Sequence, residues 1–124
     1  MAQIDTEVLA ALQAITGEDR VLTDAENLQY YGQDWTRFHQ PAPCAVVLPG
    51  SIEEVQSIVR LAGAHQLALV PSGGRTGLSA GAVAAKGELV VAMDRINHIA
   101  DFNPVDRTVR CGAGVITEQL QQYA

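Results

Sequence analysis

The amino-acid sequence predicts an α/β fold, a small βαβ-type parallel sheet flanked by helices and followed by the start of a second αβ segment. Residues 43–82 contain a strand-like run, an amphipathic helix and a second strand-like run, which is the order of a βαβ unit with parallel strands. Residues 83–124 continue with further strand and helix patterns. The 124 residues are 48% hydrophobic and 18% charged, which is typical of a globular domain.

Residues 1–42 are predicted to be a helical lead-in. The first helix has an apolar face formed by Val8, Leu12 and Ile15, and it is expected to begin at a cap at residues 5–6 and to stop at Gly17. Thr23 and Glu26 have the spacing of a capping box, which predicts a short second helix that ends near Gly32.

The βαβ unit is predicted within residues 43–82. The run CAVVLP is a buried-strand pattern, and the capping pair Ser51 and Glu54 opens a helix with apolar residues at helical spacing up to about residue 65. A second strand is expected over 67–70. Because the two strands are expected to be parallel, the glycine-rich loop that follows lies at the carboxyl end of a strand, where open α/β sheets bind ligands.

Residues 83–124 are predicted to contain further strands and a helix. ELVVAM is a third strand pattern, and IADFN and RTVRCG indicate two strands joined by a turn at Asn103-Pro104. The helical pattern of GVITEQLQQYA runs to Ala124 without a glycine cap, a proline or a closing basic turn. This ending leads us to expect that the chain is the first part of a longer protein.

The loop PSGGRTGLSAG carries the strongest chemical signal. Its glycines allow backbone N–H groups to converge and a ligand to approach closely. Hydroxyl side chains and the charge of Arg75 add donors, and residues 55–87 contain no Asp or Glu, so the local field favours an anion. A surface turn with no ligand is the alternative, since glycine and serine are common in turns.

Two standard nucleotide motifs are absent. No G-x-x-x-x-G-K-[ST] sequence occurs, which argues against ATP hydrolysis of the P-loop kind. The segment Cys111 to Thr117 is close to G-x-G-x-x-G but has Thr117 in place of the third glycine. That substitution argues against a nicotinamide-binding Rossmann domain.

Composition excludes several other classes. A formal net charge of −6 argues against nucleic-acid binding, which needs a basic face. Cys44 and Cys111 lack metal-ligand or C-x-x-C spacing, so we expect no metal site and two reduced, buried thiols. No apolar run reaches the roughly 18 residues of a membrane helix, and the N-terminus lacks the basic region of an export signal. These features predict a cytoplasmic protein without a membrane span.

The loop PSGGRTGLSAG, followed by LVVAMDRINHIADFNPVDRTVRCGAGVITEQL, resembles the flavin-binding domain of the vanillyl-alcohol-oxidase (PCMH-type) superfamily. Within it the chain is most similar to the group of glycolate oxidase, D-lactate dehydrogenase and D-2-hydroxyglutarate dehydrogenase. The pair Asp34-Trp35, the segment CAVVLPGSIEEVQSIVRLA and the segment Arg95-Ile96-Asn97 extend the resemblance. It implies that residues 1–124 are the N-terminal part of a PCMH-type FAD-binding domain.

The resemblance also implies a cofactor site. The FAD diphosphate would lie on the loop, chiefly on its backbone amides. The GAG turn, residues 112–114, would lie close to the flavin. The implied cofactor-binding residues are Pro71, Ser72, Gly73, Gly74, Arg75, Thr76, Gly77, Leu78, Ser79, Gly112 and Gly114. Some relatives attach FAD covalently through a histidine at the position of Arg75, so we expect non-covalent FAD here. Ser72 stands where a larger side chain is common in the family.

In the full-length protein the implied reaction is oxidation of a small 2-hydroxy acid to the 2-oxo acid by FAD, followed by electron transfer to a separate acceptor. We assign no catalytic residue among the 124, since the histidines (His39, His65 and His98) are expected to be structural and the substrate groups to lie in a later domain. These residues alone are expected to be inactive. Two alternatives remain: a non-catalytic phosphate- or nucleotide-binding module, and a self-associating interaction domain with exposed sheet edges.

Overall fold

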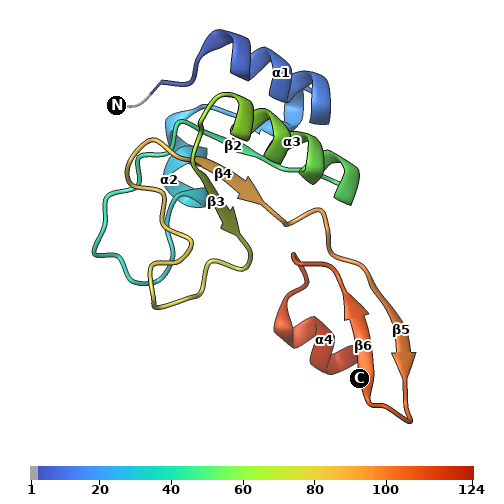
Figure 1. The fold of residues 1–124 in the computed structure, drawn as a ribbon. Helices are drawn as coiled ribbons and strands as arrows, with labels where there is room; N and C mark the ends of the chain where they lie inside the picture. The colour runs from blue at the N-terminus through green and yellow to red at the C-terminus, as the bar shows by residue number, and fades with distance from the viewer. Residues whose placement is uncertain (1–2) are drawn as a thin grey trace.

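The computed structural model describes residues 3–124, shown as a ribbon in Figure 1. Helices and strands alternate over residues 6–72, with one short 3-10 helix (η1), and three further strands and a helix follow. Their bounds are α1 Thr6–Thr16, η1 Glu18–Arg20, β1 Val21–Leu22, α2 Ala25–Tyr31, β2 Ala45–Val47, α3 Ile52–Ala64, β3 Leu69–Ser72, β4 Leu89–Ala92, β5 Ile99–Asn103, β6 Thr108–Cys111 and α4 Thr117–Tyr123.

The main sheet has four strands in the order β1-β2-β4-β3. Strands β2 and β3 each pair in parallel with β4, and the short β1 pairs antiparallel with β2. The predicted α/β class and the parallel strands are confirmed. The sequence did not indicate β1, and it did not indicate that β4, the third strand pattern, lies between the two strands of the βαβ unit.

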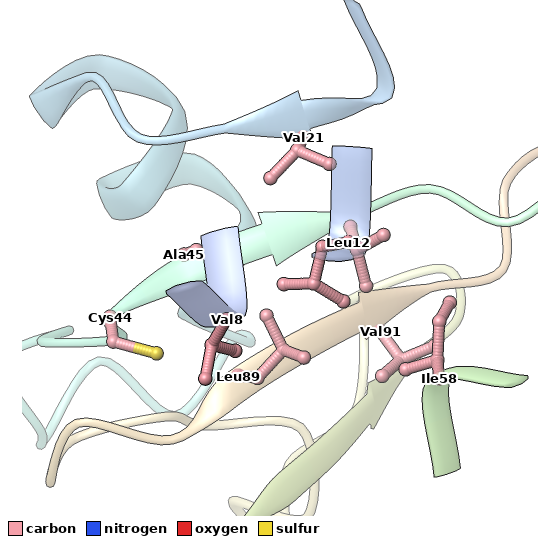
Figure 2. Close-up of a cluster of buried hydrophobic side chains, with 9 residues drawn as sticks. Val8, Leu12, Val21, Cys44, Ala45, Ile58, Leu89 and Val91 are labelled. Atoms are coloured by element: carbon pink, nitrogen blue, oxygen red, sulfur yellow. The ribbon is translucent and has the colours of Figure 1, made fainter. Parts of the chain in front are cut away.

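Both faces of this sheet are covered. Helices α1 and α3 lie side by side on one face (Figure 1), where Leu12 and Ile58 are fully buried against Leu89 of β4 (Figure 2). On the other face Leu28 of α2 packs in a cluster with Val90. Each fully buried Leu or Ile side chain stabilises the fold by roughly 1.5–3 kcal/mol. All four residues of β4 are buried, as expected for the central strand of a covered parallel sheet.

The helix caps agree with the sequence at α1 and α3 but not at α2. Asp5 caps α1 through its side chain, and Ser51 Oγ accepts a 3.2 Å hydrogen bond from Glu54 N. The capping box at Thr23 and Glu26 is wrong: the cap of α2 is Asp24, which accepts from Asn27 N at 3.1 Å. Both residues are short polar N-caps, and the aspartate one position later satisfies the first free N–H groups.

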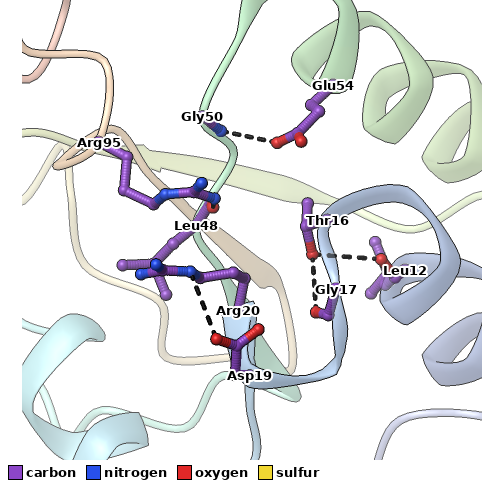
Figure 3. A network of polar contacts seen from close by, with 9 residues as sticks. All are labelled: Leu12, Thr16, Gly17, Asp19, Arg20, Leu48, Gly50, Glu54 and Arg95. Atoms are coloured by element: carbon purple, nitrogen blue, oxygen red, sulfur yellow. Dashed lines mark hydrogen bonds and ion pairs between the residues drawn. The ribbon is translucent and has the colours of Figure 1, made fainter.

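The end of β2 is held by polar contacts that Figure 3 shows. Glu54 Oε2 accepts from Gly50 N at 2.7 Å, and Arg95 Nη1 donates to the Leu48 carbonyl at 2.8 Å. A Cβ on Gly50 would lie 2.7 Å from Arg95 Nη2, so glycine leaves the space through which the arginine reaches the backbone. Arg95 therefore fastens the segment after β4 to the end of β2.

The last part of the chain is different in character. The β5–β6 hairpin and α4 project away from the main sheet (Figure 1), and none of their residues is buried. As predicted, Asn103 makes the turn: its Oδ1 accepts from Val105 N at 2.9 Å and from Asp106 N at 3.1 Å.

Both cysteines are free, and Cys44 is buried as predicted. The expectation of a buried Cys111 is wrong, because β6 lies outside the core and Cys111 is exposed. Among residues 3–124, no helix combines the length and hydropathy needed to cross a membrane.

Candidate functional site

The predicted ligand loop is Pro71 to Ser79, of which residues 73–79 leave the carboxyl end of β3 and face the GAG turn at residues 112–114. A Cβ on Gly73 would lie 3.7 Å from the Ala113 carbonyl oxygen, and one on Gly74 would lie 3.6 Å from Ile116 Cδ1. Segments separated by about 40 residues in sequence are therefore in van der Waals reach of each other. The fold brings together the two segments that the sequence singled out.

The loop glycines are not required by the protein's own packing. A Cβ on Gly77 would meet no atom within 4 Å, and neither Gly73, Gly74 nor Gly77 has the positive φ that favours glycine. In the part of the chain that the structure describes, the N–H groups of residues 74–79 find no acceptor. Unpaired N–H groups on a backbone without side chains are what a closely approaching anion needs.

Arg75 lies at the centre of the loop, and its side chain turns back beneath it. Its guanidinium makes two bonds to the Asp94 carboxylate, at 3.1 and 2.8 Å, and one to Ser72 Oγ at 3.2 Å. Burial lowers the pKa of Arg75, but its interactions with Asp94 and Tyr30 together outweigh this effect and raise the pKa above its ordinary value. Arg75 is therefore a paired charge, and Asp94 was not foreseen as its partner.

Two tyrosines at the end of α2 complete the surroundings of Arg75. Its guanidinium carbon lies 5.1 Å from the centre of the Tyr30 ring and 4.7 Å from that of Tyr31. At these distances the rings attract the cation. Burial, with the Asp94 charge second, raises the pKa of Tyr31, so this hydroxyl stays neutral at physiological pH.

The first two predicted site residues belong to β3. Pro71 is exposed in this edge strand, where the missing N–H costs no ladder bond. Ser72 is fully buried, and its carbonyl accepts a 2.9 Å hydrogen bond from Met93 N. Its side chain contacts Arg75, so the small serine leaves room for the arginine beneath the loop. The following positions Thr76, Gly77, Leu78 and Ser79 are exposed.

The GAG turn requires glycine because its backbone lies in close contact with another backbone segment. A Cβ on Gly112 would overlap the Ile96 carbonyl, and one on Gly114 would overlap the Met93 carbonyl. The same close approach allows Gly114 N to donate to the Ile96 carbonyl at 2.9 Å. These two glycines therefore pack the start of α4 against the segment after β4, and they hold the turn next to the loop.

The Asp34-Trp35 pair supports the outer side of the loop. Trp35 N donates to the Gly77 carbonyl at 3.1 Å, and Asp34 Oδ1 accepts from Thr36 Oγ1 at 2.6 Å and Thr36 N at 2.8 Å. These hydrogen bonds, the hydroxyl first, lower the pKa of Asp34. Trp35 is 60% exposed, so its ring does not anchor a core. Its backbone, not its ring, fixes the segment.

A cavity of about 160 Å³ opens between this segment and the loop, lined among others by Trp35, Arg37 and Gly74. Across residues 3–124, no group of three or more His, Cys, Asp or Glu side chains is placed to hold a metal ion. What the site offers is a concave, donor-rich backbone surface for an anionic group.

Sequence reasoning missed Asp94, Tyr30 and Tyr31. The stretch around the loop has no acidic residue in sequence, but Asp94 follows β4, which lies beside β3 in the sheet. The sequence signal that could have identified Asp94 was its position directly after the third strand pattern. Carboxyl ends of neighbouring parallel strands meet at one edge of a sheet.

Comparison with known proteins identifies the family of the chain. Residues 43–124 match a family described as FAD binding domain. The chain is 57% identical over 120 residues to a D-2-hydroxyglutarate dehydrogenase of Stutzerimonas stutzeri (strain A1501), covering 97% of this chain and 26% of the relative. It is 51% identical over 120 residues to one of Xanthomonas citri pv. viticola, covering 97% and 25%.

The fold is also found in a solved structure of alkyldihydroxyacetonephosphate synthase. That structure has a TM-score of 0.86 and 19% identity, and the match covers 98% of this chain and 25% of that one. The chain thus spans about a quarter of the length of the curated relatives it matches. From its matched residues and its identity to these relatives, the chain belongs to the FAD binding domain family.

Proposed function

We propose that this chain is the diphosphate-binding part of an FAD-dependent dehydrogenase that oxidises a 2-hydroxy acid of the D-2-hydroxyglutarate type. The observation that carries the proposal is the loop after β3. Its N–H groups over residues 74–79 have no acceptor in the described part of the chain, and its glycines have no packing reason. The substrate class rests on the names of the relatives that are 57% and 51% identical.

When bound, FAD supplies a ring that accepts a hydride from the substrate. The residues of this chain bind and orient it. The loop N–H groups donate to the negative diphosphate, and the hydroxyls of Thr76 and Ser79, both exposed, are available as additional donors. The turn that contains Gly112 and Gly114 lies beside them and limits how the cofactor can extend from the loop. The substrate base and the electron acceptor are assigned to other parts of the enzyme.

We further propose that the FAD is bound non-covalently. The position at which some relatives have a linking histidine is Arg75, whose guanidinium is bonded to Asp94 and Ser72. A charged guanidinium is not a nucleophile, and this one is engaged with a carboxylate. Acid precipitation of the protein loaded with FAD is expected to leave all of the flavin colour in the supernatant. Colour retained on the pellet would contradict the proposal.

Calorimetric titrations of the chain test where the cofactor binds. FAD and ADP both contain a diphosphate and are expected to bind and to compete, whereas riboflavin, which has none, is expected not to displace either. A chain that binds riboflavin and not ADP would contradict the assignment of the loop to the diphosphate.

A chimera tests the reaction. Here the chain replaces the matching 120 residues of the Stutzerimonas stutzeri relative. The chimera is expected to purify with flavin absorbance and to be bleached by D-2-hydroxyglutarate, with D-lactate and glycolate as comparison substrates. If it binds FAD but no 2-hydroxy acid bleaches it, the proposal reduces to nucleotide binding alone.

A further inference from the structure

Arg75 connects three parts of the chain beneath the loop. Arg75 is a residue of the loop. Its guanidinium bonds to Asp94, which follows β4, and contacts the rings of Tyr30 and Tyr31 at the end of α2. The Arg75 side chain is only 11% exposed, whereas that of Asp94 is 35% exposed. A paired arginine that contacts two rings and a carboxylate in a fork holds a fixed orientation.

The backbone of Arg75 lies in a bend of the loop. Its φ is 60°, which is the left-handed region that costs a residue with a side chain roughly 1 kcal/mol. Gly74 and Gly77, which would adopt this conformation without that cost, do not have it. The contacts of the arginine side chain are what compensates for the conformation of its backbone.

The charge of Arg75 is neutralised locally. The Asp94 carboxylate lies 2.8 Å from Arg75 Nη2, so the pair has no net charge when seen from the loop surface. A bound diphosphate would therefore gain little Coulomb energy from Arg75, while the N–H groups on either side of it remain available.

We propose that Arg75 is a positioning residue: its pairing with Asp94 holds the loop in the shape that presents its N–H groups, and it does not supply the charge that binds the cofactor. This rests on the proposed function, namely that FAD binds at this loop. The two roles make opposite predictions for Asp94. If Arg75 positions the loop, removing the Asp94 charge weakens binding, but if Arg75 attracts the diphosphate directly, removing that charge strengthens it.

The test is a double-mutant cycle on the chain with Arg75→Gln, Asp94→Asn and both together, titrated with FAD by calorimetry. Each single variant is expected to weaken FAD binding about tenfold, and the double variant no more than either single one, because both act through one contact. Tighter binding by Asp94→Asn, or losses that multiply in the double variant, would overturn the proposal. Arg60→Gln removes the same charge from an exposed helix position and is the matched control, expected to bind like the unmodified chain.

A measurement without FAD separates this inference from the proposed function. Nuclear magnetic resonance order parameters of the loop amides are expected near about 0.85 in the unmodified chain and below about 0.6 in either single variant. Unchanged values would contradict the inference even if FAD binds. Conversely, if the unmodified chain takes up no FAD but the order parameters fall in the variants, only the proposed function is contradicted.

Arg75→Lys provides a milder variant in case Arg75→Gln does not fold. Lysine keeps the charge but cannot make the two-bond fork to Asp94. It is therefore expected to lose FAD affinity to about the same extent as Asp94→Asn. Full affinity in Arg75→Lys would show that charge alone is sufficient and would overturn the proposal.

Discussion

The two glycine-rich segments of the site look alike in sequence but have glycine for opposite reasons. In the loop of residues 73–79, a Cβ on Gly77 would meet nothing within 4 Å. In the GAG turn, a Cβ on Gly114 would overlap the Met93 carbonyl. The first segment has room that its own fold leaves unfilled, while the second has none.

The difference teaches how to separate binding from architecture. Where the fold leaves no space for a Cβ atom, packing explains the glycine, and the glycine gives no information about a ligand. A glycine with free space and an ordinary φ is not explained by packing, and beside unpaired N–H groups a ligand can explain it. In this molecule only the loop glycines meet that second condition within the described site, so substitutions at the two segments should have opposite consequences for stability and for binding.

The largest effect is expected for Gly114→Ala. The new methyl group must displace the backbone of the segment after β4, which we expect to destabilise the chain by about 3 kcal/mol. Denaturant unfolding followed by circular dichroism measures the change. Gly63→Ala is the matched control: Gly63 lies in α3 with no atom within 4 Å of a Cβ, and alanine there should stabilise by roughly 0.5–1 kcal/mol. A Gly114→Ala chain with unchanged stability would remove the distinction between the segments.

The next effect is expected on binding and not on folding. Gly77→Ala has space for its methyl group, so its free energy of unfolding should remain within about 1 kcal/mol of the unmodified chain. The methyl group would stand on the surface that the diphosphate approaches, and FAD affinity should fall about tenfold, or about 1.4 kcal/mol. Gly81→Ala, equally unobstructed but beyond residue 79, is expected to change neither quantity. Equal affinities of all three chains would show that the loop does not bind FAD.

A smaller, pH-dependent effect is expected where the loop is tied to residues 34–36. The pKa of Asp34 is lowered from its ordinary 3.8 in the folded chain, so the folded state binds fewer protons than the unfolded state near that pH. The resulting stability is present above the unfolded pKa and is lost as the pH falls through the folded one. Thr36→Val removes the hydroxyl donor to Asp34, and its stability should vary less with pH between about 5 and 2.

Unfolding curves at several pH values measure this slope, and Thr117→Val, at the start of the distant α4, serves as its control. A Thr36→Val chain with the same acid dependence as the unmodified one would mean that the hydroxyl does not set the pKa of Asp34.

The smallest expected effect is a difference in reactivity between the two cysteine thiols. Cys44 is buried, and burial raises the pKa of its thiol, whereas Cys111 is exposed beside Gly112. Because the thiolate is the reactive form, an alkylating reagent should modify one thiol in the folded chain and both in denaturant. Peptide mass spectrometry should locate the first at Cys111. In Gly114→Ala, the second thiol is expected to react sooner, since unfolding exposes Cys44.

Much of this arrangement could be predicted from local sequence patterns. Apolar spacing located α1 and α3, and glycine content after a strand located the loop. Pairings between distant residues could not be predicted in this way. The partner of Arg75 is 19 residues away and is placed by the order of strands in the sheet, which periodicity does not contain. The exposure of Cys111 and Trp35 likewise depends on which elements pack on the core, since both residue types are commonly buried.

The position of β4 between β2 and β3 has a consequence for how the chain folds. The two strands of the βαβ unit, β2 and β3, make no ladder with each other, because β4 lies between them and pairs with both. Until residues 89–92 arrive, a growing chain has two strands and a connecting helix but no parallel sheet to join them. The parallel part of the sheet can therefore be completed only when this fully buried strand lies between partners that precede it by about 20 and 40 residues. The same strand also brings Asp94 to Arg75, so the parallel sheet and the contact beneath the loop of residues 73–79 depend on one segment of the chain.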